Sequence, residues 1–344
     1  MHGLSDRWAE MGAALVASAL ASWGLGFVVR RWLTRMQIID LPNERSSHVL
    51  PTPRGGGVGI MAVIGLGIAV LLVRSGGAAI WAMAIATLAL VAVSFLDDRH
   101  TVSWRIRLGV QALAAAVAVA GIVVSSYRED WRMAAAAFPF LVFIGVGYAN
   151  VFNFMDGING LAAGQAALTG LGTALVGLAA GAAPGHPVTV ISLLVAGSAA
   201  GFLPHNFPRA RMFMGDVSSV PLGFLLALLA AWIACERGFW LLVPLGLLHA
   251  NFILDSGLTL VRRMARRDVL HQAHREHFYQ RLVRAGWSHT TVTGIECGLQ
   301  AVVVLGAVAA VGRGLLLQAL AAGLTLALWF SFFGFCEREF RRNG

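Results

Sequence analysis

The sequence predicts an all-α polytopic membrane protein with about eleven transmembrane helices, and three observations lead to this fold class. Hydrophobic residues make up 58% of the 344-residue chain and charged residues only 12%, against roughly a quarter charged in an average protein. The apolar residues fall into blocks long enough to cross a bilayer as helices. The charges lie between these blocks and do not form a single basic surface of the kind that binds nucleic acid. A soluble enzyme, a nucleic-acid-binding domain and a disordered chain are therefore all but excluded.

The apolar blocks define the expected spans, in chain order. They cover residues 11–29, 56–73, 79–96, 108–124, 136–152, 161–182, 188–204, 217–234, 238–256, 293–311 and 315–335. The first block does not look like a cleaved signal peptide, because no net positive charge precedes it and its arginine cluster follows it. Three single cysteines in apolar stretches are expected to be packing residues: Cys235, Cys297 and Cys336.

The arginines predict the orientation of these spans. All 26 basic residues are Arg, and alternating the spans places 20 of them on one side and 6 on the other. Because basic residues concentrate in cytoplasmic loops, the N-terminus is expected outside and the C-terminus in the cytoplasm. We expect residues 1–344 to form one domain, with its active-site loops on the cytoplasmic side. These loops are 40–57, 97–107, 150–160, 205–216 and 257–292.

Four aspartates on that side are candidate catalytic or metal-binding residues. Asp97 and Asp98 end an apolar run, where two adjacent carboxylates repel unless a cation or a protonation role stabilises them. The alternative is a solvated helix end, since Arg99 follows. Asp156 and Asp216 are the natural pair for Mg²⁺, which proteins hold with one or two carboxylates plus substrate phosphates.

An Asn-rich segment precedes the sixth span. Asn150, Asn153 and Asp156 are spaced by three, so on a helix they form one polar stripe in an apolar context. Gly157 and Gly160 are then expected to break the helix and let the backbone approach a ligand. The stripe suits a sugar, a nucleotide or hydrated Mg²⁺. A purely structural stripe that bonds neighbouring helices is the alternative.

Two further segments carry basic residues that could meet phosphate. In the Pro/Gly-rich loop 40–57, these are Arg45, His48 and Arg54, although a plain connecting loop is the alternative. His271, His274 and His277 repeat every three residues, so on a helix they would sweep about a 120° face. With Arg275 they suit a phosphate-binding surface. A zinc site and an amphipathic helix on anionic lipid are the alternatives.

Five motifs in this order resemble the polyprenyl-phosphate N-acetylhexosamine-1-phosphate transferase family, also called glycosyltransferase family 4. They are D-x-P-x-x-R-x-x-H-x-x-P-x-P-R-G-G-G (40–57), the Asp97-Asp98 pair, N-x-x-N-x-x-D-G (150–157), F-M-G-D (213–216) and the histidine segment. The resemblance implies transfer of a sugar 1-phosphate from a UDP-N-acetylhexosamine to undecaprenyl phosphate with release of UMP. It also implies a Mg²⁺ cofactor, with Mn²⁺ as the alternative ion, and a place in O-antigen, lipopolysaccharide or other cell-envelope glycan synthesis.

The resemblance also implies roles for individual residues. Asp216 matches the family's metal aspartate, and Asp97 and Asp98 match its catalytic pair. Asp156 matches its metal and catalytic region. The candidate substrate-binding residues are Arg45, His48, Arg54, Asn150, Asn153, Asn159, Asn206, His274, Arg275 and His277.

The chain departs from the family pattern at several positions. Asn159 stands where a second aspartate is usual, and Ser218 replaces a glycine. Lysines common in the family are absent, so Arg105 or Arg107 is expected to supply their charge. The form H-R-E-H-F-Y-Q-R-L resembles the branch that uses 6-deoxy sugars such as N-acetyl-fucosamine or N-acetyl-quinovosamine.

Two other function classes remain open from the residues alone. A transporter or flippase for an anionic lipid or sugar phosphate would need polar residues across the bilayer midplane, whereas the polar clusters here stop at one face. A membrane lipid phosphatase or pyrophosphatase would share the metal site but release inorganic phosphate. Membrane lipid is an expected partner, nucleic acid is not, and a homodimer is compatible with the sequence.

Overall fold

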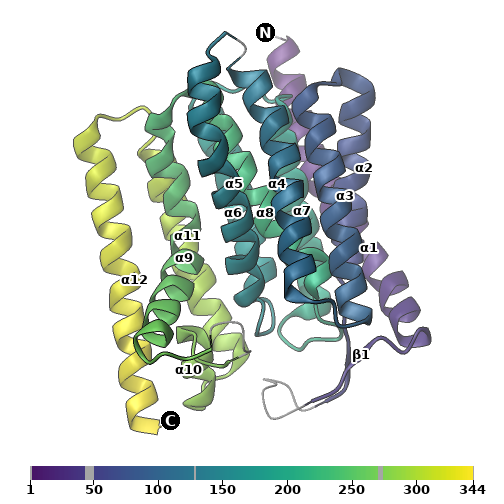
Figure 1. Cartoon of the computed structure of the whole chain (residues 1–344), viewed down its shortest axis with the longest axis vertical. Helices are drawn as coiled ribbons and strands as arrows, with labels where there is room; N and C mark the ends of the chain where they lie inside the picture. The colour runs from purple at the N-terminus through teal and green to yellow at the C-terminus, as the bar shows by residue number, and fades with distance from the viewer. Residues whose placement is uncertain (1, 43–49, 128, 270–273, 344) are drawn as a thin grey trace.

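A computed structural model describes residues 2–42, 50–127, 129–269 and 274–343 as a bundle of long helices (Figure 1). In this part of the chain, 11 helices are long and apolar enough to cross a membrane, which confirms the predicted number. They are α1 (His2–Arg35), α2 (Val58–Ser75), α3 (Ala78–Arg99), α4 (Trp104–Ser126), α5 (Trp131–Phe154), α6 (Leu161–Ala179), α7 (Pro187–Asn206), α8 (Asp216–Arg237), α9 (Leu242–Ala265), α11 (His289–Ala309) and α12 (Leu315–Asn343). The short helices are η1 (Phe239–Leu241) and α10 (Phe278–Arg284).

Several helices run past the apolar blocks that predicted them. Helix α3 continues to Arg99, so Asp97 and Asp98 lie within its last turn and not in the loop after it. Helix α9 continues to Ala265 and α12 to Asn343. Hydropathy reports the part of a helix that suits hydrocarbon, whereas backbone hydrogen bonding continues into polar residues beyond it.

Helix α8 is the central helix of the bundle (Figure 1). Every residue of its most apolar 18-residue window is buried inside the protein, and it packs against α3, α4, α5, α6 and α7. Between Asp216 at its first position and Glu236 near its end, it carries no charged residue. The fold therefore holds the Asp216 carboxylate at the end of a fully enclosed helix.

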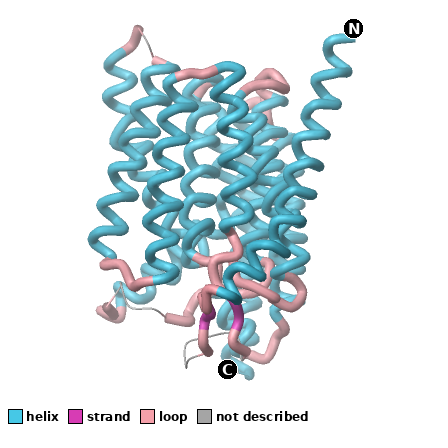
Figure 2. The backbone as a smooth tube through the Cα atoms, turned by 90° about the vertical axis from the view of Figure 1, so that its right-hand side faces the viewer, coloured by secondary structure: helices cyan, strands magenta, loops and turns pink. Residues whose placement is uncertain are grey.

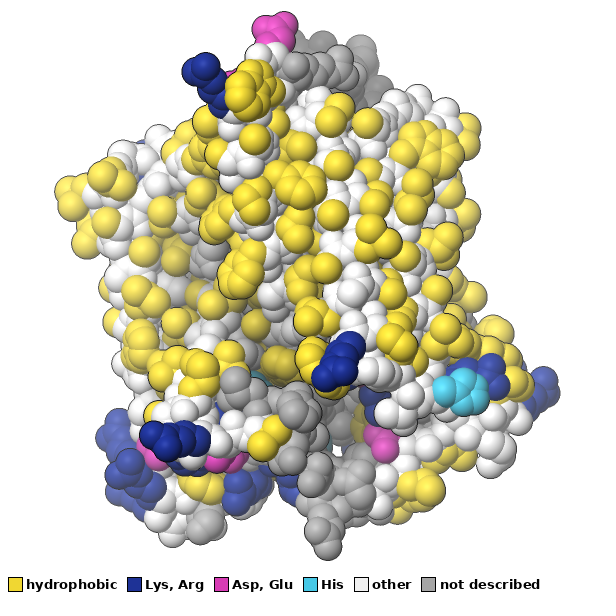
Figure 3. Space-filling model, viewed as in Figure 1, with side chains coloured by type: hydrophobic (Ala, Val, Ile, Leu, Met, Phe, Trp, Pro, Cys, Tyr) yellow, Lys and Arg dark blue, Asp and Glu magenta, His cyan; other side chains and the backbone are white. Residues whose placement is uncertain are grey.

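The two ends of the bundle differ. The chain termini lie at opposite ends, and the strands and longest loops gather at the end that holds the C-terminus (Figures 1 and 2). There β1 (Ile39–Asp40) pairs antiparallel with β2 (Thr52–Pro53). The face in Figure 3 is largely hydrophobic along the bundle, and its arginine side chains cluster mainly at this same end. We call it the loop end.

Glycines at three positions let the segment after β2 lie directly against the start of α8. The Gly56 and Gly57 N–H groups donate to the carbonyls of Phe213 (2.8 Å) and Met214 (2.9 Å). A Cβ on Gly57 would overlap the Ser218 hydroxyl. At Gly215, φ is +79° and a Cβ would lie 2.7 Å from the Asp98 Oδ2, so only glycine fits without strain. Three distant segments thereby meet at one point.

Candidate active site

Asp98 caps helix α8. Its two carboxylate oxygens accept hydrogen bonds from the backbone N–H groups of Asp216 (3.0 Å) and Val217 (2.9 Å). These N–H groups have no partner within their own helix, and a carboxylate at a helix N-terminus is favoured by the helix dipole. Arg54 Nε also lies 2.9 Å from Asp98 Oδ1, and the Asp98 side chain is only 1% exposed. Asp98 therefore fixes the position of Asp216 relative to α3.

Asp216 accepts hydrogen bonds from two arginines. Arg54 Nη2 lies 2.7 Å from Oδ1 and Arg107 Nη1 lies 3.4 Å from Oδ2. Arg107 Nη1 also lies 2.6 Å from Asp97 Oδ2. Burial lowers the pKa of Arg54, but the nearby carboxylates of Asp216 and Asp98 raise it by more. The net shift of this pKa is therefore upward. Arg54 is thus held as a cation between Asp98 and Asp216, and Arg107 lies between Asp97 and Asp216.

Asp156 lies beyond the end of α5, close to this cluster. Burial raises the pKa of Asp156 to about 7, and the negative charges of Asp216 and Asp98 add to the effect while Arg54 opposes it. The four aspartate carboxylates of the cluster and the guanidinium groups of its two arginines carry a net charge of minus two when all are ionised. The aspartates are Asp97, Asp98, Asp156 and Asp216, and the arginines are Arg54 and Arg107. This excess of negative charge adds to burial, which is the main cause of the raised pKa of Asp156.

The donor set fits a divalent cation that substrate helps to hold. Within the described ranges, no three His, Cys, Asp or Glu side chains form a preformed metal cage, so the zinc interpretation of the histidines has no support there. Mg²⁺ needs only one or two protein carboxylates, with water and phosphate oxygens completing its shell. Asp216 and Asp156 could hold it, and its charge would balance the excess in the cluster.

The asparagines of the predicted polar stripe bond to two different neighbouring helices. Asn150 Nδ2 donates to Gln111 Oε1 of α4 (2.7 Å), whereas Asn153 Oδ1 accepts from the Ser219 hydroxyl of α8 (2.6 Å). Helix α5 ends at Phe154, so Asp156 is not on the helix as the spacing predicted. The reason is the Gly-containing turn that follows, which the sequence also predicted.

Asn159 and Asn206 bond to the backbone of neighbouring loops. Asn159 Nδ2 donates to the Pro208 carbonyl (3.2 Å), and Asn206 Oδ1 accepts from the Gly160 N–H (2.6 Å). Asn206 Nδ2 donates to the Met212 carbonyl (3.0 Å). The two asparagines join the loops between α5 and α6 and between α7 and α8. In this structure their amides therefore bond to protein backbone.

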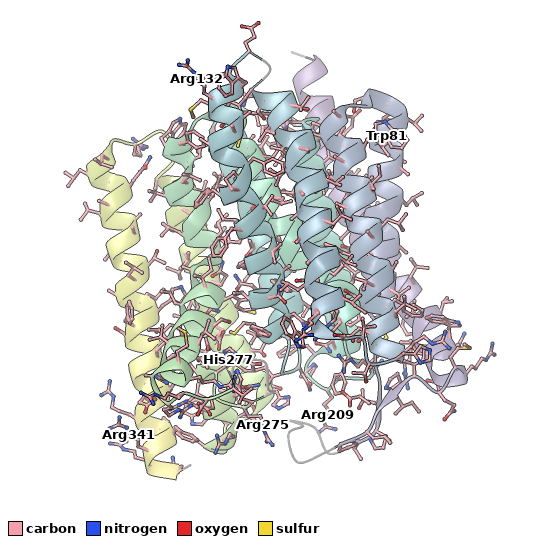
Figure 4. The ribbon with its side chains drawn as sticks, viewed as in Figure 1. Trp81, Arg132, Arg209, Arg275, His277 and Arg341 are labelled. Atoms are coloured by element: carbon pink, nitrogen blue, oxygen red, sulfur yellow. The ribbon has the colours of Figure 1, made fainter. Side chains whose placement is uncertain are left out.

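In the described part of the histidine segment, residues 274–277, the chain is irregular and does not form the helix that the spacing suggested. Residues 274–277 precede α10, and Figure 4 shows His277 and Arg275 at the loop end. The His277 ring stacks against His274, with centroids 5.0 Å apart. Burial, with help from His277 and Arg263, lowers the pKa of His274 to about 4, so His274 is neutral at pH 7. The predicted residues Arg45, His48 and His271 lie outside the described residues.

A cavity of about 750 Å³ extends from Arg107, which bonds Asp97 and Asp216, to His274 and His277. Side chains of α4, α5, α9 and the histidine segment line it, among them Arg107, Gln111, Asn150, His274, His277 and Gln280. Ile144, Tyr148 and Ile253 also line a second cavity of about 520 Å³ between α5, α8 and α9. The lining of this second cavity is almost wholly apolar, including Phe140, Leu141 and Leu245. The cavity that holds Arg107 and the histidines therefore adjoins an apolar groove along the helices.

Three residues at this site were not predicted from the sequence, namely Gln111, Ser219 and Asp255. Asp255 is 1% exposed within α9 and lies 2.8 Å from the Nδ1 atom of His277. A single carboxylate inside an apolar span is itself a signal of function or pairing, and this signal could have identified Asp255. Gln111 and Ser219 carry no comparable signal, because only the fold shows which asparagine each one bonds.

Comparison with known proteins gives consistent matches. The family model described as glycosyl transferase family 4 matches residues 80–234. The chain is 29% identical over 334 residues to the decaprenyl-phosphate N-acetylglucosaminephosphotransferase of Mycobacterium tuberculosis (strain ATCC 25618 / H37Rv), covering 88% of this chain and 83% of the relative. It is 27% identical over 300 residues to the probable undecaprenyl-phosphate N-acetylglucosaminyl 1-phosphate transferase of Bacillus subtilis, covering 83% and 81%.

A further relative is more similar in sequence. The phospho-N-acetylmuramoyl-pentapeptide-transferase of Synechococcus sp. (strain JA-3-3Ab) is 31% identical over 317 residues, covering 85% of this chain and 89% of the relative. These relatives are all named as transferases, and the matches extend over most of both chains. The chain therefore belongs to glycosyl transferase family 4, the family of polyprenyl-phosphate sugar-1-phosphate transferases whose motifs it carries.

Proposed function

We propose that the protein transfers an N-acetylhexosamine 1-phosphate, or its 6-deoxy form, from a UDP-sugar to undecaprenyl phosphate and releases UMP. The relatives are named for polyprenyl-phosphate acceptors and for transfer of a sugar phosphate. The product would start O-antigen, lipopolysaccharide or another cell-envelope glycan. The proposed cofactor is Mg²⁺, and the proposed location is the bacterial inner membrane.

The observation that carries this proposal is that the charged cluster adjoins the apolar groove. Arg107 bonds Asp97 and Asp216 and also lines the 750 Å³ cavity, which shares three side chains with the apolar groove. A lipid phosphate has a charged head and a long apolar tail, and this arrangement offers an environment for each. The groove supports a polyprenyl acceptor because its walls contain almost only hydrocarbon.

The residues of the cluster account for the chemistry of joining two anions. Both substrates are anionic, so their approach requires positive charge and in-line positioning. Arg54 and Arg107 supply guanidinium groups for phosphate oxygens. Asp97, which is less enclosed than Asp98, would orient the attacking lipid phosphate or accept its proton. Asp98 would hold Asp216 in place through the cap of α8.

The proposed Mg²⁺ site consists of Asp216 and Asp156. When bound, the ion would neutralise charge on the sugar diphosphate and ease departure of UMP. The excess negative charge of the cluster supports this site. The loop end would face the cytoplasm, where UDP-sugars are available, and the clustering of arginines there supports this orientation.

A panel of donors tests the proposal. Purified protein would be incubated with undecaprenyl phosphate, Mg²⁺ and each of several UDP-N-acetylhexosamines, including UDP-N-acetylfucosamine and UDP-N-acetylquinovosamine. We expect UMP release and a lipid product heavier by one sugar phosphate with at least one donor. Absence of lipid-linked product with every donor would count against the proposal.

A further inference from the structure

A buried carboxylate outside the aspartate cluster contacts the histidine segment. Asp255 lies on α9, and its Oδ1 atom is 2.8 Å from His277 Nδ1. Its Oδ2 atom accepts from the backbone N–H of Phe278 at 3.0 Å. The Asp255 and His277 side chains are 1% and 4% exposed. Asp255 thus bonds both the ring of His277 and the backbone that follows it.

We propose that Asp255 is a positioning residue that keeps Nδ1 of His277 protonated and so directs Nε2 of this ring, as an N–H donor, to the substrate phosphate. This inference rests on the proposed function, because it assigns a role to His277 in that reaction. A carboxylate can only accept hydrogen bonds, so the nitrogen that faces it must carry a proton. The partner of one ring nitrogen sets the state of the other.

The surroundings hold the His277 ring in one orientation. It stacks between His274 (centroids 5.0 Å apart) and Tyr279 (5.8 Å, interplanar angle 15°). The backbone N–H of His277 donates to Gln280 Oε1 at 3.3 Å. The ring also lines the 750 Å³ cavity together with Arg107 and Asn150. Because Nδ1 bonds Asp255, Nε2 is the atom through which His277 can reach a ligand in that cavity.

The nearby charges favour an anion at this position. His274 and Arg263 line the same cavity, and the lowered pKa of His274 means that it contributes a neutral ring. With the Asp255 carboxylate at Nδ1, a doubly protonated His277 would donate from Nε2 to a phosphate oxygen while its charge stays balanced. An oppositely oriented ring would present Nδ1 to the ligand and leave Asp255 without its partner.

The substitution Asp255→Asn distinguishes an effect of Asp255 on the protonation of His277 from an effect of side-chain packing alone. The amide keeps the size of the carboxyl group, and its oxygen must still accept from Phe278 N–H. Its NH₂ group then faces His277 and can only donate, which forces Nδ1 to act as an acceptor and leaves the ring with a proton on Nε2 alone, without the positive charge. The variant therefore changes the protonation of one ring while keeping the fold, as does an Asp-to-Asn change in a catalytic triad.

Two measurements test the inference. In ¹⁵N-histidine NMR of the full-length protein, with His277 assigned by its loss in His277→Gln, Nδ1 should be protonated in the natural protein and unprotonated in Asp255→Asn. The same protonation state in both proteins would overturn the inference. This measurement is independent of activity, so it stands even if no donor yields lipid-linked product.

The kinetic test is a comparison of single and double variants. Asp255→Asn should lower kcat at least about tenfold, with both KM values within about twofold of those of the natural protein. In the His277→Gln background the same change should lower kcat by less than about threefold, since the affected ring is absent. Equal losses in both backgrounds would overturn the inference. Glu296→Gln, which alters a buried carboxyl on α11 that bonds Asn251, is the matched control and should keep kcat.

Discussion

Asp97 and Asp98 are neighbours in the chain but bond to different groups. Asp98 accepts from two backbone N–H groups of α8, whereas Asp97 accepts from Val102 N–H and from Arg107. The sequence could predict that this pair matters, because two carboxylates at the mouth of a span are costly. It could not predict the division of roles, since the helix N–H groups that Asp98 bonds belong to Asp216 and Val217, more than 100 positions away in the chain.

The division of roles predicts different effects of the two Asp→Asn substitutions. Each should lower the rate by orders of magnitude. Asp98→Asn should also lower the free energy of unfolding by about 1–3 kcal/mol, because one buried backbone N–H loses its acceptor. Thermal unfolding in detergent and single-turnover kinetics would measure both effects. If Asp98→Asn were as stable as the natural protein, Asp98 would not be a structural cap.

His274 predicts a pH dependence of stability. Its pKa is about 4 in the folded protein, against about 6.5 for an unperturbed histidine. The unfolded state therefore binds more protons between these values, so stability is lost as pH falls from about 6.5 towards 4. His274→Gln should reduce this loss, measured as the change in Tm between pH 7.5 and pH 5. An unchanged pH dependence would contradict the burial of a neutral His274.

At the scale of elements, the sequence predicted the helices well and their ends less well. Eleven apolar blocks became 11 candidate spans, because hydrophobic length determines what crosses a membrane. The histidine spacing predicted a helix, but the described residues 274–277 are not helical and α10 begins at Phe278. There Asp255 accepts hydrogen bonds from the Phe278 N–H and the His277 ring. These tertiary contacts outweigh the helix that the three-residue spacing of the histidines favours.

The contact between the start of α2 and α8 gives an element-scale prediction. Gly57→Ala should push the Arg54 segment away from Asp216, because the added Cβ would overlap the Ser218 hydroxyl. We expect a loss of about 1–3 kcal/mol in stability and a large loss of activity. Gly65→Ala on the same helix is the control, since nothing lies within 4 Å of its added Cβ. Equal behaviour of the two variants would contradict the close contact.

At the scale of the whole molecule, the groove between α5, α8 and α9 extends the site away from the loop end. Gly246 lines it, and a Cβ at this position meets nothing within 4 Å. Gly246→Leu should therefore fill the groove without disturbing packing. We expect KM for undecaprenyl phosphate to rise roughly tenfold, about 1.4 kcal/mol, while KM for the UDP-sugar stays unchanged.

The length of the acceptor provides the control for this prediction. A short isoprenyl phosphate would not reach Gly246, so its KM should be the same in Gly246→Leu and the natural protein. Gly306→Leu on α11, where an added Cβ also meets nothing within 4 Å, should change neither KM. A rise in KM for long and short acceptors alike would mean that the groove does not hold the lipid tail.

The central claim is that the Asp216 cluster transfers a sugar 1-phosphate to a lipid phosphate. The most direct measurement is the ratio of UMP to lipid-linked sugar diphosphate formed from a UDP-sugar, undecaprenyl phosphate and Mg²⁺. The proposed function predicts one UMP for each lipid product, and no product from a correctly folded Asp216→Asn variant. Release of inorganic phosphate without use of the nucleotide, or full activity of Asp216→Asn, would contradict it.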